Sequence, residues 1–186
     1  MENFLSLIKS RRSIRHFQVR DVPRELLDQV LEAVRWTPSW ANTQCWEIIV
    51  VQNAETRQHL REFAGKGNPG AEALLQAPVV LAICGKLHVS GFYKNQATTR
   101  HGDWFMFDLG LATQNLCLMA HHLGLGTVIL GLFDQDSAKE VLQVPDDYEL
   151  LVLVPLGYPE RVTGPPKRKE ISRFTHFETF SAKPAE

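Results

Sequence analysis

Two segments of this chain carry side chains that could bind an anion. The segment Ser10–Arg15 offers three guanidinium groups and two hydroxyls within six residues. Guanidinium forks beside hydroxyls suit a phosphate monoester, which is dianionic and needs donors that converge from several directions. A second basic run, Lys167–Lys169, follows two prolines near the C-terminus. Two like-charged segments would repel each other unless an anion lay between them, so the pair favours an anion site.

The overall charge limits the kind of anion. The chain has 20 Lys and Arg against 21 Asp and Glu, and its formal charge is -1. Five basic residues lie in 9–20 and another five in 161–173, so half of the positive charge is concentrated near the two ends. This balance argues against a nucleic-acid partner held by bulk positive charge. Either basic segment alone also fits a solvated turn, and a non-catalytic anion- or nucleic-acid-binding module stays open as an alternative with steep salt dependence.

A third segment, 38–46, could hold a planar ring. It carries two amides, two indoles and two hydroxyls at a turn that begins with Pro38. Such a loop can supply donors and acceptors to a heterocycle while its indoles exclude water. The alternative is that Asn42 caps a turn through its own backbone and that the tryptophans Trp36, Trp40 and Trp46 belong to the core. The segment alone does not decide between the two.

Composition and motifs exclude several other classes. With 186 residues, of which 44% are hydrophobic, the chain has the size and apolar content of one domain. Its three cysteines are far apart, which indicates free thiols in a reducing cytoplasm, and we expect no metal site. Cys45 has no identifiable base and is expected to be inert. The apolar region 104–123 is interrupted by polar residues and is a poor membrane span, so no membrane partner is expected.

The elements that position these segments follow from apolar spacing. Helices are predicted at 2–9, 24–34, 55–63, 103–123 and 137–142, strands at 47–52, 79–84, 127–130 and 150–156, and a mobile loop at 85–102. The helix over 103–123 is the longest and is expected to be central. Helices that alternate with apolar strands predict a single three-layer α+β domain.

Taken in order, these segments resemble the nitroreductase family of FMN-dependent oxidoreductases over residues 4–169. An R-R-S-x-R element stands at 11–15 and a P-S-x-x-N-x-Q-P-W element at 38–46, where Cys45 replaces the usual proline. A D-x-G-x-A-x-Q-N-L helix segment stands at 108–116 and runs into G-L-G-T at 124–127. Finally, G-Y-P at 157–159 precedes a Pro-rich, basic stretch at 165–169. The four matches in this order are far more specific than any one of them.

The resemblance implies a three-layer α-β-α nitroreductase-like fold, with a central mixed, mainly antiparallel sheet and a long central helix. It implies one domain over 1–170 and a C-terminal tail over 171–186 that wraps a partner subunit. It also implies a cytoplasmic homodimer with FMN at the subunit interface, where the P-S-x-x-N segment of one chain faces the R-R-S element of the other.

The resemblance further implies the chemistry and the residues that serve it. Hydride passes from NADH or NADPH through flavin N5 to an electron-poor acceptor, such as a nitroaromatic or a quinone, by a ping-pong mechanism. FMN carries the chemistry and no catalytic side chain is expected. A specialised relative of reductive-dehalogenase or flavin-destructase type is the alternative within the fold. The expected cofactor-binding residues are Arg11, Arg12, Ser13, Arg15, Pro38, Ser39, Trp40, Asn42, Asn68, Leu130, Gly131, Lys167, Arg168 and Lys169.

Overall fold

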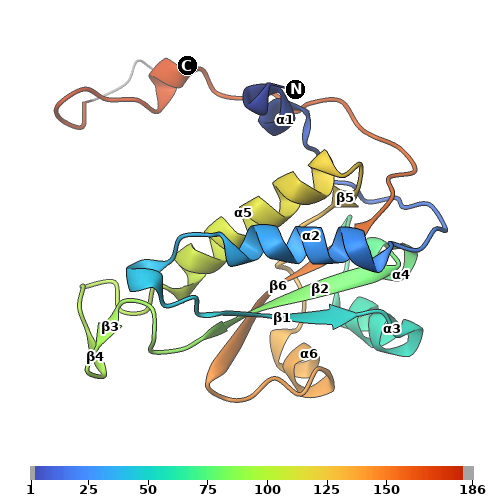
Figure 1. Cartoon of the computed structure of the whole chain (residues 1–186), viewed down its shortest axis with the longest axis horizontal. Helices are drawn as coiled ribbons and strands as arrows, with labels where there is room; N and C mark the ends of the chain where they lie inside the picture. The colour runs from blue at the N-terminus through green and yellow to red at the C-terminus, as the bar shows by residue number, and fades with distance from the viewer. Residues whose placement is uncertain (1–2, 182–186) are drawn as a thin grey trace.

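The structure is a computed structural model, and it describes residues 3–181. A four-stranded sheet lies between two layers of helices (Figure 1). The strands follow the order β1-β2-β6-β5, and every neighbouring pair is antiparallel. Their bounds are β1 Trp46–Val51, β2 Val79–Lys86, β5 Gly126–Thr127 and β6 Tyr148–Gly157. A parallel component enters only at an isolated bridge between Ser13 and Thr127 within this described part.

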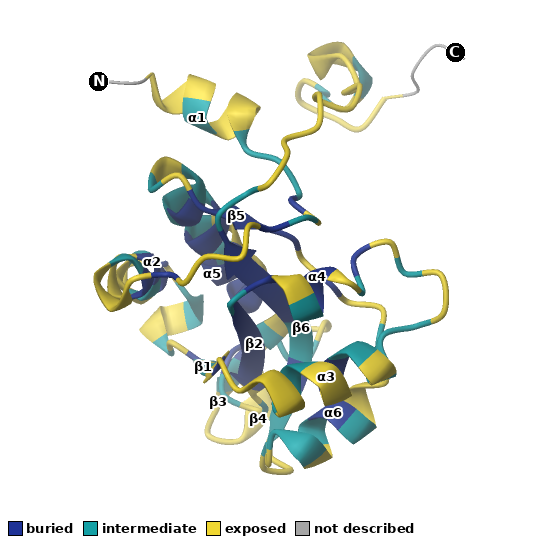
Figure 2. Ribbon diagram, turned by 90° about the vertical axis from the view of Figure 1, so that its right-hand side faces the viewer, coloured by how far each residue is buried: buried dark blue, intermediate teal, exposed yellow. Residues whose placement is uncertain are grey.

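Strand β2 shows why the domain has three layers. Successive side chains of a strand point to opposite faces, so a continuous apolar run needs cover on both sides. Val79, Leu81 and Ile83 face one core, and Val80 and Ala82 face the other. The sheet is therefore buried between two helical layers, as the dark ribbon in Figure 2 shows.

The first helical layer is formed by α2, Arg24–Arg35, and α5, Phe105–His122. Helix α2 buries Leu27, Val30 and Val34, whose spacing of three and four places them on one stripe. Helix α5 is apolar around most of its surface, as expected of a helix that packs between a sheet and a neighbouring helix. The predicted long central helix is confirmed.

The second layer covers the other face of the sheet. Its helices are α3 Ala54–Phe63, α4 Ala73–Gln76 and α6 Gln135–Val141. Asn53 caps α3 by accepting a hydrogen bond from the Thr56 N–H, and Asp134 caps α6 in the same way through the Ser137 N–H. The predicted three-layer α+β architecture is confirmed by these two layers.

The segment 85–102 differs from the expected mobile loop. It contains a hairpin of β3, Phe92–Tyr93, and β4, Gln96–Ala97. Lys94 and Asn95 connect these strands with φ of 49° and 62°, the two positive values of the turn that matches strand twist. The predicted strand 127–130 is also shorter, because β5 ends at Thr127 and Leu130 makes a separate bridge to Leu153.

Helix α1 and the described part of the C-terminal segment both lie beyond the same end of α5 (Figure 1). Helix α1, Phe4–Ser10, has no buried residue, and the chain from Glu160 onward is mostly exposed apart from a short 3-10 helix η2, Ile171–Arg173. The predicted 171–186 tail is described only to residue 181, and residues 1, 2 and 182–186 lie outside the described part. None of the helices in residues 3–181 has the length and apolar content needed to cross a bilayer.

Candidate functional site

The two predicted basic segments meet in one hollow of about 870 Å³. Lys9, Arg11 and Arg12 line it from the end of α1, and Arg168 and Lys169 line it from the C-terminal segment. We call it the basic hollow. Within residues 3–181 none of these five cations forms an ion pair with a carboxylate. Like charges that converge without a carboxylate leave room for an anionic ligand.

The arginines of the hollow differ in how they are held. The Arg12 guanidinium donates to the carbonyls of Lys9, at 2.6 Å, and Arg11, at 2.7 Å, so the backbone already occupies part of its fork. The half-buried Arg11 side chain lines the basic hollow and also a smaller cavity of about 160 Å³ beside His121 and Thr127. Arg11 is therefore the cation best placed to reach a ligand from the protein side.

The R-R-S element is attached to the C-terminal end of α5. The Ile14 N–H donates to the Thr127 carbonyl at 2.8 Å, next to the bridge from Ser13. Gly126 permits this approach, since a Cβ there would lie 2.6 Å from the Ile14 side chain. The Ser10 hydroxyl contacts His121 at 2.7 Å.

Three predicted residues of the two basic segments do not line the basic hollow. Ser13 instead forms a backbone bridge to Thr127. Arg15 and Lys167 are exposed, and the Lys167 carbonyl accepts a long hydrogen bond from Arg168 at 3.5 Å. The structure therefore brings residues of both basic segments together and leaves these three outside the hollow.

The loop of residues 38–45 lies at the opposite end of α5. It contains a 3-10 turn η1, Trp40–Asn42, and left-handed φ angles of 45° at Ala41, 56° at Asn42 and 49° at Gln44. Side chains other than glycine rarely adopt this region, and each such residue costs roughly 1–3 kcal/mol. The Gln44 N–H donates to the Ser39 hydroxyl at 2.9 Å. Strain of this density occurs chiefly where a surface is shaped for a ligand.

The structure also decides the alternative interpretation of this loop. The Asn42 side chain is exposed and, among the described residues, has no hydrogen-bond partner, so it does not cap the turn. It lines a hollow of about 400 Å³ with Pro38 and Gln44. Trp46 packs against the core, whereas Trp36 is 74% exposed. The core alternative therefore holds for Trp46 and fails for Trp36, and the capping alternative fails for Asn42.

Asn68, Leu130 and Gly131 form a third group, in which Asn68 lies between α3 and α4 and the other two residues lie between β5 and α6. The Asn68 amide donates to the Leu132 carbonyl at 3.0 Å and accepts the Gly70 N–H at 3.0 Å. The Leu130 N–H is engaged by the Leu153 carbonyl at 2.9 Å. Of this group only Gly131 presents an exposed backbone, so Asn68 and Leu130 hold the local structure here.

Within one chain the basic hollow and the 38–45 loop are far apart. Helix α5 has 18 residues, which corresponds to roughly 27 Å at 1.5 Å per residue. Trp40 contacts Asp108 in its first turn, and Ser10 contacts His121 in its last turn. A ligand of flavin size cannot touch both ends of this helix on one subunit.

The residue Cys45 carries a thiol that stays protonated at neutral pH. Its side chain is 4% exposed and donates to the Asp108 carboxylate at 3.6 Å. Burial, assisted by the negative charge of Asp108, raises the pKa of Cys45 to about 12. The thiol is thus a hydrogen-bond donor and a poor nucleophile, in agreement with the sequence-based expectation.

Sequence reasoning did not assign three residues that the structure places at these sites. Lys9 lines the basic hollow, and Asp108 and Ser90 are buried beside the 38–45 loop. Asp108 is the only acidic or basic residue, histidines aside, in the sequence of α5. A single carboxylate in an apolar helix is the signal that could have identified it.

The fold and these segments together define an α+β domain that is built to bind an anionic, planar ligand. The chain belongs to the nitroreductase family, whose sequence model, described as "Nitroreductase family", matches residues 8–158. This match covers most of the chain and all of the core elements from α2 to β6.

Several known proteins are similar to the chain over most of its length. An "NADH dehydrogenase" of Thermus thermophilus is 30% identical and covers 88% of the chain and 90% of its own length. The "FMN reductase [NAD(P)H]" of Bacillus subtilis is 29% identical over 97% of the chain and 75% of its own length. "Iodotyrosine deiodinase 1" of Rattus norvegicus is 29% identical over 92% of the chain and 68% of its own length.

A solved structure gives the same result for the fold. An "FMN-dependent Nitroreductase" of Clostridium difficile R20291 superposes with a TM-score of 0.79 at 25% identity. The match covers 95% of the chain and 99% of that protein. The predicted nitroreductase-like fold is thereby confirmed.

Proposed function

We propose that this chain is an FMN-dependent NAD(P)H oxidoreductase that acts as a homodimer and reduces an electron-poor acceptor. The named relatives support the cofactor and the electron donor. The observation that carries the proposal is the basic hollow, where two segments from opposite ends of the sequence bring their cations together.

The residues of the basic hollow fit the phosphate of FMN. A phosphate monoester at neutral pH is close to dianionic, and five cationic side chains line the hollow without an acidic neighbour in that lining. Its walls are apolar, from Leu5, Ile8 and the prolines 165 and 166. Apolar walls around a charged cluster strengthen its attraction for an anion.

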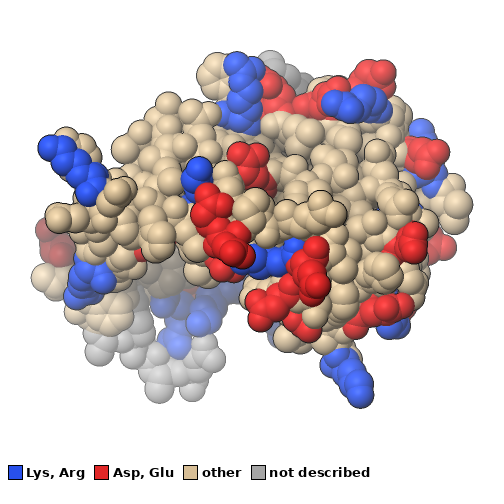
Figure 3. All heavy atoms as spheres, turned by 90° about the horizontal axis from the view of Figure 1, so that it is seen from below, with Lys and Arg blue, Asp and Glu red and all other residues tan. Residues whose placement is uncertain are grey.

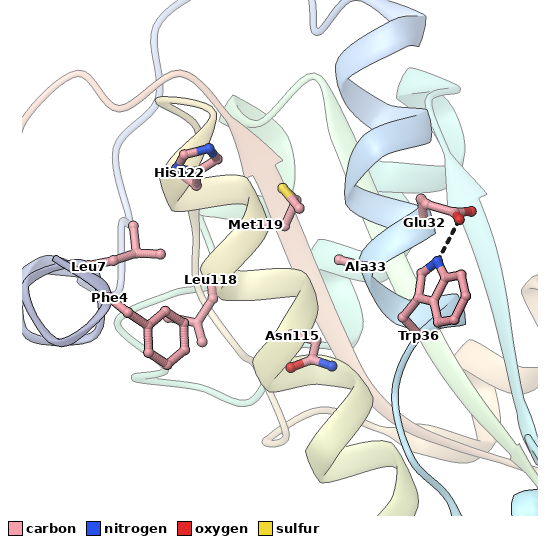
Figure 4. A pocket seen from close by; sticks show the side chains of 9 residues that line it. All are labelled: Phe4, Leu7, Glu32, Ala33, Trp36, Asn115, Leu118, Met119 and His122. Carbon is pink, nitrogen blue, oxygen red and sulfur yellow. Dashed lines mark hydrogen bonds between the residues drawn. The ribbon is translucent and has the colours of Figure 1, made fainter. Parts of the chain in front are cut away.

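The surface that a second copy would cover is apolar. A groove of about 500 Å³ runs between α1, α2 and α5. Figure 4 shows Phe4 and Leu7 from α1 beside Leu118 of α5, with Met119 and Trp36 across the groove. Helices as short as α1 are marginal on their own, and Phe4 is 66% exposed. Exposed apolar grooves of this kind mark protein interfaces.

A homodimer also completes the site. Because the 38–45 loop and the basic hollow lie at opposite ends of α5, one chain supplies the phosphate half and its partner supplies the ring half. The C-terminal segment carries exposed aromatic side chains that would pack on the partner, namely Phe174, Phe177 and Phe180. This arrangement gives two equivalent sites per dimer.

When bound, FMN would supply the hydride-transfer chemistry between NAD(P)H and the acceptor. The chain's own residues would hold and orient the reactants. Arg11, Arg12, Arg168 and Lys169 would hold the phosphate, Ser13 and Arg15 would face the pyrimidine side, and the exposed Gly131 backbone would serve the N5 side of the ring. Donor and acceptor use one pocket in turn, which is ping-pong kinetics.

An aromatic cavity indicates the class of acceptor. It measures about 310 Å³ and is lined by Trp40, Trp104, Phe107 and Leu111 among others. The two indole rings lie 5.1 Å apart, and Trp104 and Phe107 meet edge to face at 5.5 Å. Flat, electron-poor rings stack well on such walls, which favours quinones and nitroaromatics. The similarity to iodotyrosine deiodinase makes halide release from an iodinated aromatic ring the second activity to assay.

Charge on the rest of the surface does not favour the nucleic-acid alternative. On the face seen in Figure 3, acidic and basic side chains are interspersed. Polyanion binding needs an extended basic stripe, and the cations of this chain converge instead on one small hollow.

The test is purification followed by an absorbance spectrum, FMN titration of flavin-free protein, and turnover with NADH and NADPH against a quinone and a nitroaromatic. We expect the purified protein to show flavin absorbance bands, to take up FMN saturably and to turn over with these substrates. Sedimentation should show a dimer. Protein that neither retains nor takes up FMN would contradict the proposal. Tight FMN uptake by a monomer would contradict only its dimer part.

A further inference from the structure

Asp108 is a buried carboxylate that the proposed chemistry does not use. It lies in the first turn of α5 and is 1% exposed. Its oxygens accept hydrogen bonds from the Trp40 N–H at 3.1 and 3.2 Å and from the Ser90 hydroxyl at 2.7 Å. Cys45 adds the weaker thiol donor. Among residues 3–181 no Lys or Arg forms an ion pair with it.

A buried carboxylate without a cation depends on its hydrogen-bond donors. Its burial costs several kcal/mol unless the lost hydration is replaced. Asp108 obtains replacement hydrogen bonds from three residues in two separate parts of the chain, and further stabilisation from the N-terminal dipole of α5. The same contacts therefore tie those parts to one another.

The first of these parts is the 38–45 loop with its three left-handed residues. Local bonds shape the turn, from the Asn42 N–H to the Ser39 carbonyl at 3.1 Å and from the Thr43 N–H to the Trp40 carbonyl at 2.9 Å. Strained backbone persists only where the surroundings over-determine it. The bond from the Trp40 N–H to Asp108 is the tertiary contact that fixes the start of this turn to the core.

The second part is the segment that carries Trp104. Ser90 is fully buried; its hydroxyl donates to Asp108, and its carbonyl accepts the Trp104 N–H at 3.0 Å. The next residue, Gly91, packs against the indole, since a Cβ there would lie 2.5 Å from Trp104 Cδ1. One carboxylate thus holds Trp40 directly and Trp104 through Ser90.

We propose that Asp108 is a positioning residue, whose carboxylate sets the conformation of the 38–45 loop and the spacing of the Trp40 and Trp104 indoles. This inference rests on the proposed function, because the loop is the ring half of the FMN site there. Asp108 acts through the loop and takes no part in bond making. Its hydrogen bonds to the two segments that carry these indoles couple the cofactor half of the site to the aromatic cavity.

The test uses Asp108→Ala and Asp108→Asn in the full chain, with Leu116→Val as the matched control. Leu116 is fully buried on the same helix and contributes only to the core. Hydrogen exchange over residues 38–45 is measured on flavin-free protein, and FMN affinity and the visible circular dichroism of bound FMN are measured after reconstitution.

For Asp108→Ala we expect exchange in the loop to rise and FMN affinity to fall, each by about tenfold, the scale of one charge-assisted hydrogen bond. The flavin dichroism should change as well. Asp108→Asn keeps one acceptor for the Trp40 N–H and should show a smaller change in the same direction. Leu116→Val should lower the melting temperature without altering any of the three readouts.

The outcomes separate this inference from the proposed function. Unchanged hydrogen exchange over residues 38–45 in both Asp108 variants overturns the inference. Faster exchange with unchanged FMN affinity and dichroism overturns the inference as well. If the alanine variant does not fold, the asparagine variant and Ser90→Ala decide. Ser90→Ala should raise the acceptor KM with little effect on FMN affinity. Wild-type protein that binds no FMN overturns the proposed function, and the exchange data then decide the loop role alone.

Discussion

Removal of Arg11 tests the phosphate site most directly. Arg11 is half-buried and forms no ion pair with a carboxylate of residues 3–181, so little in this part of the chain competes for its guanidinium. A hydrogen bond to a charged group contributes about 1.5–3 kcal/mol, and solvent in the open hollow places Arg11 near the middle of that range. We expect Arg11→Ala to weaken FMN binding by about 2 kcal/mol, roughly 30-fold.

Substitution of the other cations of the hollow should weaken FMN binding less, according to how exposed each side chain is and which groups it already binds. Arg168 is exposed, and salt and water screen its charge. Arg168→Ala should therefore cost about 1 kcal/mol, roughly fivefold. Arg12→Ala should fall below Arg11→Ala, because the backbone already occupies part of the Arg12 fork.

The chain offers a matched control within the C-terminal basic run. Lys167 has the same charge as its neighbours but does not line the hollow. Fluorescence titration of flavin-free protein should give an FMN dissociation constant for Lys167→Ala within about twofold of wild type. Equal effects of Lys167→Ala and Arg168→Ala, or no effect of Arg11→Ala, would refute the assignment of this hollow.

Three further perturbations address the interface, the aromatic cavity and the buried thiol. Phe4→Glu places a charge in the apolar groove. In sedimentation runs this variant should be a monomer without bound FMN, whereas Gln58→Glu, on the exposed face of α3, should remain a dimer. Trp104→Ala should raise the quinone KM about fivefold through lost stacking, and Trp104→Phe should restore most of it. Because folding raises the pKa of Cys45 from 9.0 to about 12, its contribution to stability is complete below pH 9 and declines above it. Wild type should lose about 1–2 kcal/mol more than Cys45→Ala between pH 8.5 and 10.5 in urea denaturation; parallel pH curves would contradict this.

Local patterns predicted the core elements well. Strand β2 contains the apolar run 79–84, and α5 contains most of the periodic residues of 103–123. Both were predictable because the spacing of neighbouring apolar residues indicates which faces are buried. The hairpin in 85–102 was missed, because Lys94 and Asn95 are a weak turn signal without glycine. The position of Arg168 beside Arg11 depends on the path of an irregular segment, which no periodicity describes.

Roles within the site were harder to predict than its location. Asn68 has the residue type of a ligand contact, yet both ends of its amide bind backbone groups, the carbonyl of Leu132 and the N–H of Gly70. Asp108, by contrast, interrupts an apolar helix and begins the D-x-G-x-A-x-Q-N-L segment, and neither pattern indicates which groups its carboxylate binds. The role of a polar residue depends on which partners satisfy it, and those partners are distant in sequence.

The features of this chain that conflict with ordinary folding rules gather at the ends of α5. Three left-handed residues lie at its N-terminal end. An exposed apolar helix lies at its C-terminal end, with arginines that form no ion pair with a carboxylate among residues 3–181. In natural sequences such local conflicts persist where function requires them. Under the proposed function each conflict has a different remedy: the core carboxylate of Asp108 for the strained loop, a bound phosphate for the arginines, and a second subunit for α1. Only the first of these remedies lies within a single chain, so the proposed site is complete only with both the cofactor and the partner.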